Sequence, residues 1–269
     1  VILMLSFAVR ASFGVFQSPV AAEFGWPRAE FSLAIAIQNL AWGIGQPMFG
    51  AIAERFGDRK AIISGAILYA MGLVLSAYAT GPGQHQLLNI MIGFGIAGTG
   101  FGVVLAVVGR ATSAENRSMA LGVATAAGSA GQVFGAPLAE ILLQSHPWQT
   151  VFMIFAIIIL ATLVALPFLS TGKVATRTEL EDSLGTVLKR AFKDPSYTLI
   201  FLGFFSCGYQ LAFITAHFPA FITDFCGAIE SNSMLAGLGI KTTSALGAAS
   251  IITCTCDNTM RMPMPASMP

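Results

Sequence analysis

The sequence predicts an all-α polytopic membrane protein, and three observations lead to this prediction. Apolar residues make up 55% of the 269 residues and charged residues only 10%, whereas a soluble domain carries about 25% charged residues. Seven apolar stretches are each long enough to cross a bilayer core of about 30 Å, which takes about 20 residues of helix. Basic residues are concentrated in alternate connecting loops, as in proteins that cross a membrane repeatedly.

The expected membrane helices follow each other closely along the chain. They cover Ile2–Ala22, Phe31–Ala53, Ala61–Thr80, Leu87–Gly109, Ser118–Leu143, Trp148–Leu169 and Tyr197–Ile222. Proline-containing breaks precede the second, fourth and sixth of them, at Trp26-Pro27-Arg28, Gly81-Pro82-Gly83 and His146-Pro147-Trp148. An eighth stretch, Met234–Ile252, is interrupted by Lys241, and its insertion into the membrane stays open.

The chain divides into four regions. Residues 1–169 form a six-helix transmembrane half, residues 170–196 a hydrophilic connector, and residues 197–253 the start of a second half with one or two helices. Residues 254–269 have no helical pattern, so a disordered tail and a shifted reading frame are both open. Six helices and a charged connector match one half of a carrier built from two repeats. Because the chain opens on Val1 and ends soon after its second half begins, we expect a fragment that lacks most of the C-terminal half.

The basic residues predict which side of the membrane each loop faces. The loops after the second, fourth and sixth helices carry ten Lys and Arg residues, and the opposite loops carry one, Arg28. The positive-inside rule therefore places these three loops and the N-terminus in the cytoplasm. We expect an integral protein of the plasma membrane, which in a bacterium is the inner membrane.

Several other classes of protein find no support in the sequence. The four cysteines do not have the spacing of a metal site, because Cys254 and Cys256 are too close for a zinc pair. Paired catalytic residues are lacking, and the net charge of +1 gives no reason to expect nucleic-acid binding. We therefore expect no catalytic residue, no enzyme activity, no metal, no cofactor and no nucleic-acid partner.

A charged loop joins the second and third expected helices. It reads Gly50-Ala-Ile-Ala-Glu54-Arg55-Phe-Gly57-Asp58-Arg59-Lys60. This loop resembles the signature of the major facilitator superfamily, in which it closes the inner gate. The resemblance implies a gating role for Gly50, Glu54, Arg55, Gly57, Arg59 and Lys60. Gly50 would permit close helix approach, and Gly57 a special backbone angle. The alternative is a plain anchor loop that only fixes the topology.

A second resemblance lies in the fifth expected helix. The run from Ala127 to Pro137 is rich in glycine and is similar to the glycine- and proline-rich fifth helix of the superfamily. Small residues allow helices to cross closely, and a proline favours a bend. We assign helix packing to Gly128, Gly131, Gly135 and Pro137. Whether that packing also serves transport stays open.

Within the superfamily, the chain resembles the monocarboxylate and oxalate–formate branch. The resemblance rests on Arg10-Ala-Ser-Phe-Gly-Val-Phe16, Phe24-Gly-Trp-Pro-Arg28, Ser32-Leu-Ala-Ile-Ala-Ile-Gln-Asn39 and Cys207-Gly-Tyr-Gln-Leu-Ala-Phe-Ile-Thr-Ala-His217. It implies that the substrate is a small organic anion, carried with protons or by exchange.

Arg10 is the residue that we single out for substrate binding. It lies about 15 Å into the first expected helix, where a lipid-facing Arg costs about 2.5–3.5 kcal/mol. It should therefore face a cavity or a counter-charge, and its planar guanidinium matches a carboxylate in bidentate fashion. The alternative is that the membrane begins after Arg10 and its side chain snorkels. That would leave only Ala11–Ala22 as apolar length, which is too short to span.

Other polar residues of the expected helices are further candidates. A cavity that hydrogen-bonds a small polar substrate could be lined by Gln38, Asn39, Tyr209, Gln210 and His217. Steps of seven and eight residues return near one helix face, which groups the last three. His217 could also carry a coupling proton, and an interfacial histidine is the alternative.

Two classes of function compete. The first is a secondary transporter of small organic anions, monocarboxylate-like, that works by alternating access in the lipid bilayer. The second is a truncated membrane protein that does not transport. Within the superfamily, a carrier of another substrate class, such as a drug-efflux carrier, is also open.

Overall fold

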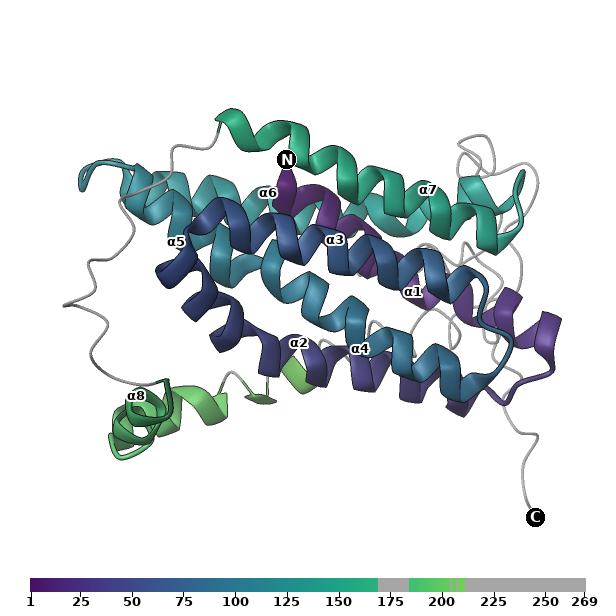
Figure 1. Cartoon of the computed structure of the whole chain (residues 1–269), viewed down its shortest axis with the longest axis horizontal. Coiled ribbons are helices and arrows are strands. Elements are labelled where there is room, and N and C mark those ends of the chain that lie inside the picture. The colour runs from purple at the N-terminus through teal and green to yellow at the C-terminus, as the bar shows by residue number, and fades with distance from the viewer. Residues whose placement is uncertain (169–183, 204, 207, 211–269) are drawn as a thin grey trace, which may run out of the picture.

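The computed structural model describes residues 1–168, 184–203, 205–206 and 208–210, and within them it contains helices and no strand (Figure 1). The labelled α-helices are α1 (Ile2–Phe24), α2 (Arg28–Phe56), α3 (Asp58–Ala77), α4 (Pro82–Thr99), α5 (Phe101–Ala111), α6 (Arg117–Leu143), α7 (Trp148–Ala161) and α8 (Leu184–Ala191). A 3-10 helix, η1 (Thr162–Phe168), follows α7. The seventh expected helix, Tyr197–Ile222, is helical in its described part, and the eighth stretch, Met234–Ile252, lies outside the described residues.

Four described segments are long and apolar enough to cross a membrane. They are α1, α3, the stretch Pro82–Ala111 that contains α4 and α5, and the stretch Trp148–Pro167 that contains α7. The two longest helices complete the bundle, because α2 packs along α4 and α6 packs along α1. The chain is therefore an all-α polytopic membrane protein, as the sequence predicts.

The fourth expected helix, Leu87–Gly109, is not continuous, and the prediction of a single helix is wrong here. Gly100 separates α4 from α5 with an extended backbone, φ −90° and ψ −167°. Glycines also stand two residues before it and two residues after it, at 98 and 102, and glycine disfavours the helix interior by about 1 kcal/mol relative to alanine. An apolar run long enough to span carries no signal of such an interruption.

Two other glycines end helices with a positive φ. Gly25 terminates α1 in the left-handed region, at φ 65° and ψ 23°, a common way for a helix to stop. Gly57 separates α2 from α3 at φ 96° and ψ 150°, a region that only glycine adopts readily. One residue therefore reverses the chain within the signature loop. Among the described residues, no atom lies within 4 Å of a Cβ at Gly50, so the close helix approach expected there stays a prediction.

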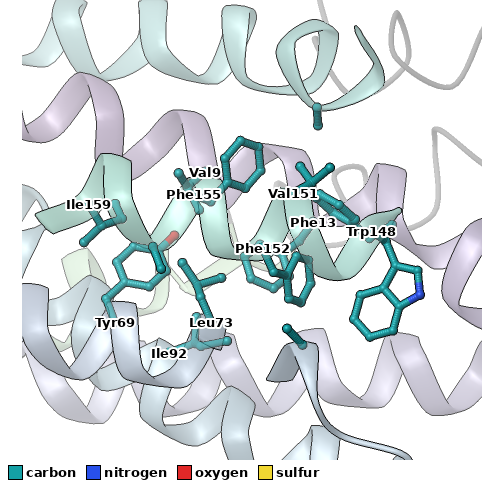
Figure 2. Close-up of a cluster of buried hydrophobic side chains, with 14 of the residues drawn as sticks. Val9, Phe13, Tyr69, Leu73, Ile92, Trp148, Val151, Phe152, Phe155 and Ile159 are labelled. Atoms are coloured by element: carbon teal, nitrogen blue, oxygen red, sulfur yellow. The ribbon is translucent and has the colours of Figure 1, made fainter. Parts of the chain in front are cut away.

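The helices meet in an apolar core that extends along the bundle. Figure 2 shows Tyr69 and Leu73 of α3 facing Ile92 of α4 and the row Val151, Phe152, Phe155 and Ile159 of α7. The end of the bundle that holds Gly57 is called here the Gly57 end, and the opposite end, which holds Trp26, the Trp26 end. The core fills the space between these ends, so polar side chains within it need a specific reason to be there.

Small residues let α1 and α6 approach very closely. A Cβ at Gly131 or at Gly135 would lie 2.0 Å from the carbonyl oxygen of Met4 or of Ala8, respectively. A Cβ at Gly128 would lie 2.8 Å from the Phe101 ring. The glycines assigned to packing thus lie against the backbone of α1 and the start of α5, and Pro137 lies within the same helix α6.

Candidate functional site

Arg10 lies inside the bundle, held between two helices. Its side chain is 6% exposed, and its Nη2 donates to Oδ1 of Asn39 at 2.8 Å. The guanidinium carbon is 4.6 Å from the ring centroid of Trp42 and 5.8 Å from that of Phe7. Asn39 is itself fixed, because its Nδ2 donates to the carbonyl oxygen of Ile35 at 2.9 Å. An amide and two aromatic rings therefore set the position of the cation.

Among the described residues, no carboxylate forms an ion pair with Arg10. A buried charge is ordinarily paired, because desolvation otherwise costs several kcal/mol. A guanidinium has five N–H donors, and Asn39 accepts from one of its nitrogens. The arrangement around Arg10 therefore supplies a positioned cation with donors left for an anionic group.

Hydroxyl groups join three helices beside this cation, next to the break at Gly100. Oγ of Ser6 and Oγ1 of Thr99 lie 2.8 Å apart, which links α1 to the end of α4. The hydroxyl of Tyr69 on α3 donates to the carbonyl oxygen of Ser6 at 3.4 Å. These three residues are fully buried, so they fix α1 against the point at which the fourth span is interrupted. Sequence analysis missed them because a Ser, a Thr and a Tyr in apolar stretches give no pattern.

The other expected binding residues lie elsewhere. Gln38 is 2% exposed and belongs to the interface of α2 with α4, where its main-chain carbonyl oxygen would be 2.3 Å from a Cβ at Gly93. Its Nε2 has no hydrogen-bond partner among the described residues. Tyr209 and Gln210 are exposed, and His217 lies outside the described residues. Of the expected set, a hydrogen bond joins Arg10 and Asn39 only, within the part of the chain that the structure describes.

The charges at the Gly57 end are arranged differently from the expected gating set. Glu54, Arg55, Arg59 and Lys60 are all exposed. The buried acid of this loop is Asp58, which is 4% exposed and forms an ion pair with Arg110 at the end of α5. Sequence analysis did not single out Asp58, because an acidic residue beside two basic residues in a loop is expected to be exposed to solvent. Its partner is 52 residues further along the chain.

The Trp26 end is closed by aromatic rings and one carboxylate. Phe24 stacks on Trp26, with ring centroids 4.7 Å apart, and lies 6.1 Å from Trp148. Glu23 accepts hydrogen bonds from Nε1 of Trp148 and Nε2 of Gln149. These contacts fasten the end of α1 to the start of α7, so both ends of the bundle have their own interhelical connections.

Two further observations bear on what the bundle could bind. A hollow of about 460 Å³ lies between the N-terminus and α6, lined by Val1, Asn116, Met119, Ala120, Val123, Ala124 and Ala127. Arg10 does not line it. Among the described residues, no group of three His, Cys, Asp or Glu side chains is placed to hold a metal ion. The positioned cation of α1 is therefore the candidate ligand-binding feature of the described residues.

The chain is similar to known membrane proteins. The model of the Major Facilitator Superfamily matches residues 1–262. Monocarboxylate transporter 13 of Bos taurus is 36% identical over 147 residues, which is 54% of this chain and 34% of that protein. The Uncharacterized MFS-type transporter YcxA of Bacillus subtilis is 27% identical over 243 residues, 86% of this chain and 57% of that protein.

A third relative is named as a multidrug resistance protein and not as a monocarboxylate transporter. The Multidrug resistance protein MdtH of Photorhabdus laumondii is 30% identical over 211 residues, 76% of this chain and 50% of that protein. The chain thus spans between about a third and just over half of the length of these relatives. The family match extends over nearly the whole chain and agrees with the membrane helices and with the signature loop. The chain therefore belongs to the Major Facilitator Superfamily, a family of membrane transporters.

Proposed function

We propose that this protein is a secondary transporter of small organic anions, and that Arg10 binds the anionic group of the substrate. The observation that carries the proposal is the buried cation itself, held by Asn39 and Trp42 and without a carboxylate partner among the described residues. A charged residue inside a membrane bundle is costly, so it indicates a functional site with a partner. A substrate carboxylate supplies that partner.

The place of Arg10 in the fold supports a role in transport. It contacts the ring of Trp42, whose Nε1 lies close to Gly100 at the break between α4 and α5, and transporters often build their sites near the middle of the membrane at interrupted helices. The monocarboxylate transporter among the relatives favours a carboxylate over other anions. Transport would proceed by alternating access, with protons or by exchange.

The proposed orientation places the Gly57 end in the cytoplasm, together with the N-terminus. Three basic residues lie at this end, Arg55 in the last turn of α2 and Arg59 and Lys60 in the first turn of α3, as the positive-inside rule requires. In a bacterium the membrane would be the inner membrane. We further propose that the exposed charges of the signature loop act in closing this end, and that Tyr209, Gln210 and His217 contribute to the cavity from the second half.

The test is binding of labelled lactate, formate or oxalate to the purified chain in liposomes, with uptake measured in the same vesicles. Arg10→Ala should abolish binding, and Arg10→Lys, which keeps the charge but loses the planar fork, should retain part of the affinity. The control is Arg117→Ala, which removes an exposed arginine at the first residue of α6. Unchanged affinity in both Arg10 variants would refute the anion site.

A carrier of another substrate class is the second candidate. It is favoured by the relative named as a multidrug resistance protein and by the two aromatic rings beside Arg10, which suit an apolar ligand. Such a carrier would bind hydrophobic compounds with an affinity that does not depend on Arg10. The same Arg10→Ala variant therefore separates the two candidates.

A further inference from the structure

Trp42 is a second unusual residue of this site, and sequence analysis passed over it. It lies near the middle of α2, one turn after Asn39. Its ring stacks beside the guanidinium of Arg10, 4.6 Å from ring centroid to guanidinium carbon, and meets Phe7 edge-on at 5.9 Å and 74°. The ring face therefore orients the plane of the guanidinium, while Asn39 occupies one of its nitrogens.

The indole N–H of Trp42 is buried and has no acceptor among the described residues. Leaving a buried donor unmatched costs about 1–3 kcal/mol, and a buried Trp N–H usually finds a partner. The group lies against Gly100, where a Cβ would be 3.4 Å from Nε1 and 3.7 Å from Nε2 of Gln46. An unmatched donor thus stands beside a positioned cation and beside the interruption of the fourth span.

These two donor groups differ in what they can bind. A carboxylate fits the edge of the Arg10 guanidinium, which offers paired donors to its two oxygens. The indole N–H belongs to the neighbouring ring, so a carboxylate that faces the guanidinium leaves it unmatched. An acceptor oxygen on the carbon next to the carboxylate would supply the missing partner.

We propose that Trp42 is a specificity-determining residue, whose indole N–H donates to an oxygen on the carbon adjacent to the carboxylate bound by Arg10. The site then selects acids with a 2-hydroxy or 2-oxo group over acids that lack it. This inference rests on the proposed function, because it assigns the second contact of the same ligand. Selectivity follows from the cost of leaving a buried polar group unpaired when the oxygen is missing.

The test compares lactate with propionate, which differ by the 2-hydroxyl group, on the full chain in detergent or liposomes. The wild-type protein should bind lactate about tenfold more tightly than propionate, the factor expected for one hydrogen bond. Trp42→Phe keeps a ring face for Arg10 and removes the N–H, so the affinity for lactate should fall to that for propionate and the preference should be lost. Trp42→Leu removes the stacking as well and should weaken both ligands.

The matched control is Trp26→Phe, the same change at the Trp26 end, which should keep the tenfold preference.

A second measurement uses native Trp42. The chain has three tryptophans, at 26, 42 and 148, so replacing Trp26 and Trp148 by Phe leaves Trp42 as the only indole. Lactate should shift its fluorescence emission and propionate should not. This readout does not require Trp42→Phe to fold.

The outcomes separate the two proposals. If Arg10→Ala abolishes binding of both acids but Trp42→Phe keeps the lactate preference of the wild type, the assignment of Trp42 is wrong and the anion site stands. An emission of Trp42 that responds equally to both acids would also exclude the hydrogen bond to the 2-oxygen. If neither acid binds to the wild-type chain, or if binding does not depend on Arg10, the proposed function and this inference fail together.

Discussion

Asp58, in the first turn of α3, forms an ion pair with Arg110, in the last turn of α5. Each charge also lies at the helix end that favours it, since an acid suits a helix N-terminus and a base a C-terminus. The carboxylate is 4% exposed, whereas Arg110 is 38% exposed. The pair therefore joins two helices at the Gly57 end through a buried acid and a partly exposed base.

Removing Arg110 should destabilise the bundle, because Asp58 is left buried without its partner. We expect Arg110→Gln to lower the free energy of unfolding by about 1–3 kcal/mol, and Asp58→Asn to cost less. Thermal unfolding in detergent, followed by helical circular dichroism, measures both. The exchanged pair Asp58→Arg with Arg110→Asp places each charge at the wrong helix end and should restore only part of the loss. Arg117→Gln is the control, and a loss equal to that of Arg110→Gln would contradict the prediction.

Adding one methyl group at the contact of α6 with α1 should separate these helices. A Cβ at Gly135 would lie 2.0 Å from the carbonyl oxygen of Ala8, which belongs to the backbone and cannot turn aside. We expect Gly135→Ala, and likewise Gly131→Ala, to cost about 1–3 kcal/mol, measured as a lower unfolding temperature in detergent.

Gly122→Ala provides the matched control for these changes. Gly122 lies in the same helix, but a Cβ there would meet no atom of the described part of the chain within 4 Å. Alanine is favoured over glycine inside a helix by up to about 1 kcal/mol, so this variant should unfold at the same temperature as the wild type or higher. If Gly131→Ala, Gly135→Ala and Gly122→Ala change the unfolding temperature alike, helix propensity and not close packing determines the effect.

The carboxylate of Glu23 should stabilise the Trp26 end of the bundle. Trp148 is 4% exposed, and Glu23→Ala leaves its indole N–H without that acceptor. We expect a loss of about 1–3 kcal/mol, and a smaller loss for Glu23→Gln, which keeps one acceptor oxygen. In a Trp148→Phe background, Glu23→Ala should cost less than in the wild type. Additive costs in this double-mutant cycle would exclude an energetic coupling between Glu23 and Trp148. The control is Glu115→Ala, which removes an exposed acid.

Sequence reasoning predicts the membrane helices well because the bilayer sets their length, and apolar length is visible in a linear sequence. It also identifies Arg10, since an intramembrane charge stands out against apolar neighbours. It does not give the partners of such residues. Trp42 looks like one more apolar side chain, and the stacking on Arg10 depends on how α1 crosses α2.

Asp58 and Gly100 are two further residues whose structural roles cannot be predicted from the sequence alone. Asp58 is buried because it pairs with Arg110 of a distant helix. The sequence of the loop alone does not predict this contact. Gly100 interrupts a span, but a glycine within an apolar stretch equally suits close packing, as Gly95 does against Tyr69. Long-range contacts decide between such alternatives, and they are determined by the packing of the whole bundle.

The two glycines with positive φ should respond differently to asparagine. Gly25 has φ 65° and ψ 23°, a left-handed conformation that asparagine tolerates. Gly57 has φ 96° and ψ 150°, a region essentially restricted to glycine. Gly25→Asn should therefore change the free energy of unfolding by about 0.5 kcal/mol or less, whereas Gly57→Asn and Gly57→Ala should each cost about 1–3 kcal/mol. Thermal unfolding in detergent compares the three variants. The control is Gly50→Ala, because no atom of the residues that the structure describes lies within 4 Å of a Cβ there. Tolerance of asparagine at Gly57 equal to that at Gly25 would mean that the α2–α3 turn does not need the extended positive-φ conformation.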